Sequence, residues 1–394
     1  MKPLKEHANK VVILDTTLRD GEQTAGVSFN ADEKLAIAQL LLEELRVDRV
    51  EVASARVSKG ESEAFRRICA WAASAGCLDR VEALGFVDDG VSVDWIADAG
   101  GRVVNILAKG SLRHLEKQLK KTPEQHAEAI IRVIAHAAER GLSVNLYLED
   151  WSNGMADSPE YVFGLLERLR SQPLRHVMLP DTLGVLNPWQ VEAFVAQMRE
   201  RFPEMAFDFH AHNDYGLAVA NTLAAVRAGI SGVHVTVNGL GERCGNASLI
   251  EIIMALEGLY GIPTGVQLSK LLELARYVAE ISGIPVPSNA PFMGKYAFSD
   301  SLAAHIALSL QDPFAVEGIR PETFGGRRIA FLSKNITEEV LQLLAGKQHL
   351  SLSKEELPRL YAKICQLSAP GTGTVLTEDD LPRLAAAIKE EEEA

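Results

Sequence analysis

The chain has 394 residues, of which 47% are hydrophobic and 24% are charged, and its formal net charge is −13. This composition is that of an ordinary soluble globular protein, long enough for one large barrel with an appendage or for two to three domains. The excess of negative charge argues against nucleic acid or an anionic membrane surface as the main partner.

Cysteine use and the N-terminus favour a cytoplasmic location. None of the four cysteines forms a Cys-x-x-Cys pair, which indicates reduced thiols and no disulfide framework. The first ten residues lack an apolar signal core, and no apolar run is long enough to span a bilayer. We therefore expect a cytoplasmic protein with no membrane partner.

Eight short β-rich runs alternate with spacers that show helical periodicity. The runs are Val11–Asp15, Val47–Ala53, Val81–Phe86, Val103–Leu107, Ser143–Leu148, His176–Leu179, Ala206–His210 and Gly232–Val237. This alternation predicts an α/β fold of the (β/α)8 TIM-barrel type. A doubly wound open sheet is the second interpretation, but it usually has fewer strands, and no Gly-x-Gly-x-x-Gly follows the first run.

The pattern changes beyond the eighth run. An amphipathic helix is predicted over Gln267–Ser282, and Pro285–Pro291 is typical of a stiff, extended linker. Two or three further helices are predicted towards the end of the chain. We therefore expect three parts, which are a catalytic barrel, a linker subdomain and a helical C-terminal subdomain over residues 1–265, 266–334 and 335–394.

Polar side chains follow several predicted strands, where a TIM barrel places its active site. His210 and His212 lie two residues apart on the seventh run, so both imidazoles face the same side of an extended strand. Asp20 follows the first run and stands beside Arg19. One hard oxygen and two imidazoles suit Mg²⁺, Mn²⁺, Fe²⁺, Co²⁺ or Zn²⁺. The alternative for the two histidines is a pair that binds no metal.

Three protein ligands would leave coordination positions open for a substrate. A 2-oxo acid could chelate the cation through its carboxylate and keto oxygens. Arg19 would then stabilise the alkoxide that develops after attack on the ketone. The alternative for Arg19 is a structural ion pair inside the barrel mouth.

Three motifs resemble those of the DRE-TIM metallolyase superfamily in order and spacing. Leu14–Gln23 resembles the signature that opens the superfamily, and His210–Asp214 resembles its His-x-His-Asn-Asp motif. Asn238–Ala247 resembles the Gly-x-Gly-Glu-Arg-x-Gly-Asn segment of the Claisen-condensing branch. That branch contains 2-isopropylmalate, citramalate and homocitrate synthases, and the short citramalate-synthase-like members are the most similar.

The resemblance implies a role for each matching residue around the metal. Asp20, His210 and His212 match the metal ligands of the family, and Asn246 matches a fourth ligand that is weaker or bridged by water. Arg19 matches the residue that binds and polarises the 2-oxo acid.

The resemblance also assigns residues to the two substrates. Thr182 matches the hydroxyl that holds the substrate carboxylate. Glu149 matches a carboxylate beside the metal and substrate, and Glu242 matches one implicated in activating acetyl-CoA. The alternative for both glutamates is support of Arg19 or Arg243.

Leu84, Leu107 and Tyr147 resemble the small apolar pocket of the citramalate synthases, which accept pyruvate. Large side chains there would exclude the branched chain of 2-oxoisovalerate on steric grounds. The same three residues are also what plain barrel packing uses, so the sequence leaves the 2-oxo acid open.

Two features depart from the family pattern. His305 lies where the family places a catalytic histidine, but the Asp-Gly stretch that should follow it is missing. This histidine is either a base for the methyl group of acetyl-CoA or a helix residue left after the loop diverged. The long synthases also carry a C-terminal regulatory domain. This chain is either an unregulated form or a piece of a longer protein, so the sequence does not predict feedback inhibition by leucine or isoleucine.

Together these features predict an acyltransferase that condenses acetyl-CoA with pyruvate or 2-oxoisovalerate to give (R)-citramalate or 2-isopropylmalate. Its cofactor would be Mg²⁺, Mn²⁺ or Zn²⁺, and the resemblance implies a homodimer in which one protomer's linker covers the other's barrel mouth. Two alternatives stay open. One is an acyl-CoA lyase or aldolase of the same superfamily, with Cys244 as the candidate cysteine, and the other is a metal- and 2-oxo-acid-binding protein without turnover.

Overall fold

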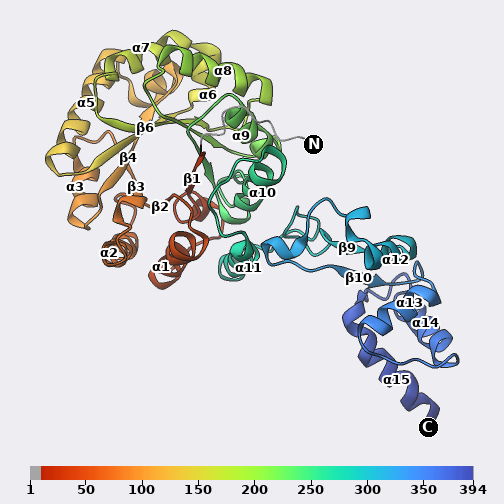
Figure 1. The fold of residues 1–394 in the computed structure, drawn as a ribbon. Coiled ribbons are helices and arrows are strands. Elements are labelled where there is room, and N and C mark those ends of the chain that lie inside the picture. Colours follow the sequence, from red (N-terminus) through yellow and green to blue (C-terminus); the bar gives the residue numbers. More distant parts are fainter. Residues whose placement is uncertain (1–9, 394) are drawn as a thin grey trace. The chain divides into compact units, whose positions relative to one another are not determined.

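The computed structural model describes residues 10–393, and the chain divides into two compact units, residues 1–285 and 286–394 (Figure 1). Residues 1–9, which are most of the segment expected to lack a signal core, lie outside the described residues, as does residue 394. The first unit contains the barrel, and the second contains a small sheet with helices.

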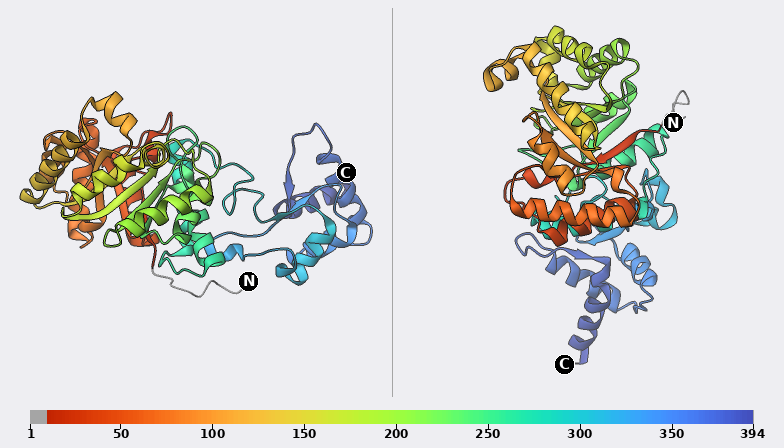
Figure 2. Two further views of the ribbon diagram at one scale, coloured as in Figure 1. Left: turned by 90° about the horizontal axis from the view of Figure 1, so that it is seen from above. Right: turned by 90° about the vertical axis from the view of Figure 1, so that its left-hand side faces the viewer.

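The first unit is a closed barrel of eight parallel strands in sequence order, in which β1 pairs with both β2 and β8 (Figures 1 and 2). The strands are β1 (Val12–Asp15), β2 (Arg49–Ser54), β3 (Val81–Phe86), β4 (Val103–Lys109), β5 (Ser143–Glu149), β6 (Leu174–Asp181), β7 (Phe207–Ala211) and β8 (Gly232–Val235). Each predicted run overlaps one of these strands. The predicted (β/α)8 TIM barrel is therefore confirmed, and the open doubly wound sheet is wrong.

Helices connect the strands and cover the outside of the barrel (Figure 2). They are α1 (Ala31–Gln39), α2 (Lys59–Ser74), α3 (Val91–Asp98), α4 (Leu112–His114), α5 (Pro123–Glu139), α6 (Trp151–Asp157), α7 (Pro159–Leu169), α8 (Pro188–Arg201), α9 (Ala218–Arg227), α10 (Leu249–Ala255) and α11 (Leu271–Ser282). Asn30, Thr122 and Asn187 begin α1, α5 and α8 with capping boxes, which satisfy N–H groups of the first turn. Within residues 10–393, no helix is long and apolar enough to cross a membrane.

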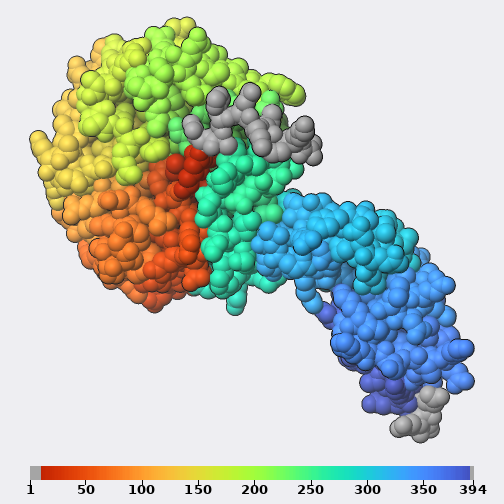
Figure 3. All heavy atoms as spheres, viewed as in Figure 1, coloured from red at the N-terminus to blue at the C-terminus, as the bar shows by residue number. Residues whose placement is uncertain are grey.

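The interior of the barrel is unusually polar. TIM barrels are commonly filled by branched apolar side chains, yet here buried polar side chains bond to one another across the strands. Asn105 donates to Glu51 at 2.7 Å and to Glu82 at 3.0 Å. Arg49 lies 3.2 Å from Glu82 and also pairs with Asp208. Glu51, Glu82, Asn105 and Asp208 are all 0% exposed, so this polar network lies beneath the outer surface that Figure 3 shows.

The second unit has one hydrophobic core. Its elements are β9 (Ser299–Asp300), α12 (Ala303–Gln311), β10 (Ile329–Leu332), α13 (Glu338–Lys347), α14 (Glu356–Leu367), β11 (Leu376–Thr377) and α15 (Leu381–Glu393). The core joins side chains from both predicted C-terminal subdomains, among them Ile306, Leu332, Leu341, Leu360 and Leu381. Short segments bury little apolar surface by themselves, so a shared core adds to their stability. Residues 286–334 and 335–394 therefore share one core, and α11 belongs to the barrel unit.

A buried lysine holds the loop between β1 and α1. The side chain of Lys34, in α1, is 1% exposed, and its ammonium nitrogen lies 2.6 Å from both Glu22 and Glu61. The same ammonium donates to the carbonyl of Leu18 at 3.1 Å. Through Lys34, the loop after β1 is therefore bonded to α1 and α2 close to Arg19.

Replacing Lys34 by methionine should destabilise the first unit by about 3–5 kcal/mol, because Glu22 and Glu61 lose their buried counter-charge. Urea unfolding followed by circular dichroism measures this loss. Lys10→Met is the control: it removes an ion pair with Asp48 from a lysine that is 56% exposed, and it should cost at most about 1 kcal/mol. Equal losses in the two variants would contradict the anchoring role.

Candidate active site

The turn after β1 places Asp20 at the C-terminal mouth of the barrel. The N–H groups of Asp20 and Gly21 both donate to the carbonyl of Thr16, at 2.8 and 3.1 Å, which closes a tight turn. The Thr17 hydroxyl accepts from the N–H of Val237 at 2.8 Å and so joins this turn to the segment after β8. The carboxylate of Asp20 is thereby fixed in a position where it is 1% exposed.

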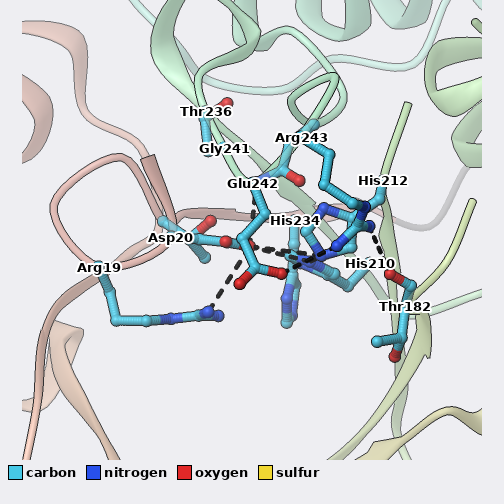
Figure 4. A network of polar contacts seen from close by, with 12 residues as sticks. Arg19, Asp20, Thr182, His210, His212, His234, Thr236, Gly241, Glu242 and Arg243 are labelled. Carbon is cyan, nitrogen blue, oxygen red and sulfur yellow. Dashed lines mark hydrogen bonds and ion pairs between the residues drawn. The ribbon is translucent and has the colours of Figure 1, made fainter. Parts of the chain in front are cut away.

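Asp20, His210 and His212 meet at the barrel mouth, with their polar ends turned towards one another (Figure 4). The Nε2 atoms of His210 and His212 lie 3.1 and 4.0 Å from Oδ2 of Asp20, and they are 3.4 Å from each other. One ligand atom from each residue lies within 4.8 Å of the other two. The structure thus brings the three predicted ligands together, while the ion itself stays a prediction.

Asn246, the predicted fourth ligand, lies beside the same carboxylate. Its amide nitrogen donates to Oδ2 of Asp20 at 3.0 Å. The loop that carries it requires glycine, because Gly245 has a φ of +85° and a Cβ there would collide with the carbonyl of Gly239. The glycines of the Gly-x-Gly-Glu-Arg-x-Gly-Asn segment therefore permit the turn that presents Asn246.

The donor set fits a divalent cation on two counts. Oδ1 of Asp20 and Oδ1 of Asn246 are buried without a hydrogen-bond partner among the described residues, as expected of oxygens that await a ligand. One carboxylate and two imidazoles are also the mixed oxygen and nitrogen donors that divalent cations accept.

The surroundings of the ligands favour the protonation states that metal binding needs. Burial alone would raise the pKa of Asp20, but Arg19 and the two imidazoles outweigh it and hold that pKa far below its ordinary value. Burial lowers the pKa of His212 to about 4, and His210 acts in the same direction. An ionised carboxylate and a neutral imidazole are the forms that coordinate metals.

Arg19 lies against the metal ligands and is held by the barrel wall. Its Nε donates to Glu51 at 2.6 Å, and one terminal nitrogen donates to the hydroxyl of Tyr147 at 3.4 Å. The other terminal nitrogen lies 3.6 Å from Oδ2 of Asp20. The structural ion pair considered for Arg19 is therefore present, and it directs the guanidinium towards the ligand cluster.

Thr182 follows β6, and its hydroxyl is oriented by the backbone. The hydroxyl oxygen accepts from the N–H of Asp150 at 2.9 Å, so its own hydrogen is available to a bound anion. Arg243 donates to the carbonyl of Thr182 at 2.7 Å and to Asp214 at 2.8 Å. This arginine joins the loops that follow β6, β7 and β8 (Figure 4).

The two predicted glutamates are paired with cations. Glu242 is 45% exposed and lies 3.0 Å from Arg243, so its alternative role as partner of Arg243 is present in the structure. Glu149 pairs with Lys109, and its other carboxylate oxygen lies 3.9 Å from Nδ1 of His114. The sequence interpretation considered neither Lys109 nor His114.

His305 lies in the second unit, on α12. Its side chain is 56% exposed, and its Nδ1 lies 3.7 Å from Asp300. Its role towards acetyl-CoA stays a prediction.

Leu84, Leu107 and Tyr147 belong to one cluster in the barrel interior, which also includes Leu14, Met178 and Phe86. The side chains pack on one another as a barrel core does, with Leu84 and Tyr147 only 5% and 2% exposed. Tyr147 also reaches Arg19 through its hydroxyl. The predicted pocket residues therefore adjoin the candidate site.

Sequence reasoning missed three buried residues that support the site, namely Glu51, Asp208 and His234. The hydroxyl of Tyr147 lies 3.0 Å from Nδ1 of His234, and Nε2 of His234 lies 3.5 Å from Asp208. Each missed residue interrupts an apolar strand, in the triplets Val-Glu-Val, Phe-Asp-Phe and Val-His-Val. A titratable residue that alternates with apolar neighbours in a strand was the signal that could have found them.

A family model described as HMGL-like matches residues 10–278. The chain belongs to this family. The HMGL-like protein is 39% identical over 349 residues to a homocitrate synthase of Methanopyrus kandleri, a match that covers 88% of this chain and 85% of the relative. The predicted membership of the DRE-TIM metallolyase superfamily is thereby confirmed.

Two further relatives of this HMGL-like protein carry other names. The (R)-citramalate synthase of Methanocaldococcus jannaschii is 34% identical over 371 residues, covering 94% of this chain and 73% of the relative. The 2-isopropylmalate synthase of Sulfolobus acidocaldarius is 34% identical over 383 residues, covering 97% of this chain and 96% of the relative. Among solved structures, the HMG-CoA lyase of Bacillus subtilis matches with a TM-score of 0.60 and 25% identity, over 71% of this chain and 96% of the lyase.

Asp20→Asn should weaken Mn²⁺ binding by about 100-fold or more, because it removes the anionic ligand while keeping the shape of the side chain. Isothermal titration of the purified protein with MnCl₂ measures the change. Asp15→Asn is the matched control: Asp15 is equally buried but lies outside the ligand cluster, so this variant should bind Mn²⁺ as the unaltered protein does. Unchanged affinity in Asp20→Asn would refute the assignment.

Proposed function

We propose that the protein is a divalent-metal-dependent synthase that condenses acetyl-CoA with a short 2-oxo acid. Pyruvate would give (R)-citramalate, and 2-oxoisovalerate would give 2-isopropylmalate. Support comes from the two superfamily motifs, from the segment Asn238–Ala247 that resembles the Claisen-condensing branch, and from relatives named as synthases at 34–39% identity. Those relatives are named for three different products, so the choice of 2-oxo acid depends on the pocket.

The observation that carries this proposal is the position of Arg19 beside the cluster of Asp20, His210 and His212. A divalent cation held by that cluster would supply Lewis-acid polarisation of the keto group. Arg19 would donate to the keto oxygen as negative charge develops there during attack. Because Glu51 and Tyr147 already fix the guanidinium, little reorganisation is needed at that moment.

The other residues would bind the acid and move protons. Thr182 would donate its free hydroxyl hydrogen to the substrate carboxylate. A base must take a proton from the methyl group of acetyl-CoA, and His305 and Glu242 are the candidates. Attack of the resulting carbanion on the keto carbon forms the new carbon–carbon bond and breaks the π bond of the keto group, and the alkoxide that results takes up a proton from the protonated base or from water. Water then hydrolyses the thioester and releases the free thiol of CoA.

The pocket cluster favours pyruvate as the 2-oxo acid. Leu84, Leu107 and Tyr147 pack together, and Tyr147 contacts Arg19, so these large side chains would disfavour a branched 2-oxo acid on steric grounds. One methylene group in such a pocket changes the transition-state free energy by about 1–3 kcal/mol. The predicted homodimer and cytoplasmic location are part of the same proposal.

Purified protein supplied with acetyl-CoA and Mg²⁺ or Mn²⁺ should release free thiol when pyruvate is added, and EDTA should abolish the release. A thiol-reactive dye follows the reaction. Arg19→Lys keeps the charge but loses the planar fork, and it should lower kcat by about 100-fold. Failure to release thiol with pyruvate, 2-oxobutyrate, 2-oxoisovalerate and 2-oxoglutarate would end the proposal. Stoichiometric binding of a 2-oxo acid without turnover would instead favour a binding protein.

An acyl-CoA lyase is the second candidate, because Cys244 is exposed on the glycine-rich loop after β8. The solved HMG-CoA lyase with the same barrel motivates this alternative. The cysteine lies between Arg243 and Gly245, within the segment that presents Asn246. This position suits a small side chain as well as a reactive one.

Cys244→Ala separates the two candidates. A synthase should keep thiol release with pyruvate within about twofold of the unaltered protein, because the thiol takes no part in condensation. A lyase should lose cleavage of its acyl-CoA substrate, which is followed as release of acetyl-CoA from HMG-CoA. A large loss of condensation in Cys244→Ala would contradict a synthase mechanism that does not use this thiol.

A further inference from the structure

We propose that Asp150 is a positioning residue for Thr182. Its carboxylate fixes a strained backbone at the end of β5, and the N–H group of that backbone orients the hydroxyl of Thr182. This inference rests on the proposed function, in which Thr182 donates to the carboxylate of the 2-oxo acid. It adds to the site a buried residue that would not touch the substrate.

The backbone of Asp150 has a conformation that residues other than glycine seldom adopt. Asp150 lies between β5 and α6, and its φ of +66° and ψ of +28° fall in the left-handed region. This region is unfavourable for a residue with a side chain, and residues that keep it in spite of the cost cluster at active sites. Glycine would adopt it without strain. An aspartate at this position therefore indicates that the side chain itself is needed.

The carboxylate of Asp150 is bound by two neighbouring segments. Its Oδ2 accepts from the hydroxyl of Ser111, in the loop after β4, at 2.6 Å, and its Oδ1 accepts from the amide of Asn153, in α6, at 2.7 Å. Ser111 also accepts from the N–H of His114 at 3.2 Å, so the one hydrogen of its hydroxyl goes to Asp150. Asp150 is 1% exposed, so little water reaches these bonds. The side chain thus holds the strained backbone in one place.

The backbone N–H of Asp150 determines how the hydroxyl of Thr182 is oriented. It donates to Oγ1 of Thr182 at 2.9 Å. The single hydrogen of a hydroxyl cannot point at a donor, so the hydrogen of Thr182 is directed elsewhere. The register of β6 on β7 puts Asp181 opposite Ala211, which lies between the two histidine ligands in the chain. Thr182, the next residue, therefore offers its free hydrogen close to the candidate metal site.

Asp150→Gly keeps the backbone N–H and tolerates the positive φ, but it removes the carboxylate that holds the backbone. The affinity for the 2-oxo acid should fall by about 5- to 10-fold. Isothermal titration of the Mn²⁺-loaded protein with pyruvate, 2-oxobutyrate, 2-oxoisovalerate and 2-oxoglutarate measures it, and the acid that binds most tightly is used for every variant. Asp150→Asn should stay within about twofold of the unaltered protein, because asparagine tolerates positive φ and its amide oxygen accepts from Ser111.

A second background separates the orientation of Thr182 from a general loosening of the barrel mouth. Thr182→Val keeps the shape of the side chain but lacks the hydroxyl, and it should weaken binding by about 10-fold or more. Asp150→Gly should cause no further loss in this background, because both changes act on the same contact. Losses that multiply would overturn the proposal. Asp89→Gly is the matched control: Asp89 also has a positive φ, +56°, but it is exposed on the loop after β3, so its loss should leave binding unchanged.

The outcomes distinguish this inference from the proposed function. If Asp150→Gly does not fold, Ser111→Ala takes its place, because it removes the hydroxyl that holds Oδ2 of Asp150. Its loss of affinity should likewise disappear in the Thr182→Val background, and a loss that persists there would overturn the inference. Binding that Asp150→Gly leaves unchanged would overturn the inference alone. Absence of binding of all four acids by the unaltered protein would end the proposed function and the inference with it.

Discussion

The ionised carboxylate of Asp20 is the constraint on which the rest of the site depends. It is 1% exposed, and a buried charge is costly unless counter-charges and hydrogen bonds surround it. Arg19 provides the counter-charge, Nε2 of His210 lies 3.1 Å from Oδ2 of Asp20, and Asn246 donates a hydrogen bond to the same oxygen. The tight turn after β1 and the glycine-rich loop after β8 exist in their observed form because these groups must reach one oxygen atom.

The polar interior below this carboxylate costs folding stability but fixes the positions of its side chains. Apolar side chains of similar volume would often fold at least as stably as a buried ionic network. A satisfied network, however, holds each member in a single orientation, since a displaced group would lose its partners in a medium of low dielectric constant. In this barrel the network holds the guanidinium of Arg19 in place through hydrogen bonds to Glu51 and Tyr147.

The barrel architecture could be predicted from the sequence because the pattern of apolar residues that indicates it is local. Apolar runs alternating with capped amphipathic helices specify a barrel, and His210 and His212 reveal themselves by their two-residue spacing. The partners of Glu51 and Asp208 could not be read in this way, because closure of the barrel decides which strands face each other. The pairing of β1 with β8 joins residues at opposite ends of the first unit.

The C-terminal part of the chain likewise shows that sequence patterns predict single elements better than their packing. Its helices were visible as patterns, but whether they share a core with the segment before them is decided by tertiary packing. The roles of His305 and Glu242 were implied by motif position alone. Glu242 pairs with Arg243, which is the alternative role that the sequence had left open.

The division of the chain at residues 285 and 286 has an evolutionary consequence. Every group proposed to bind the keto acid lies in the first unit, and His305, whose following segment departs from the family pattern, lies in the second. Because the second unit has a hydrophobic core of its own, substitutions can accumulate in it while the residues around Asp20 stay unchanged.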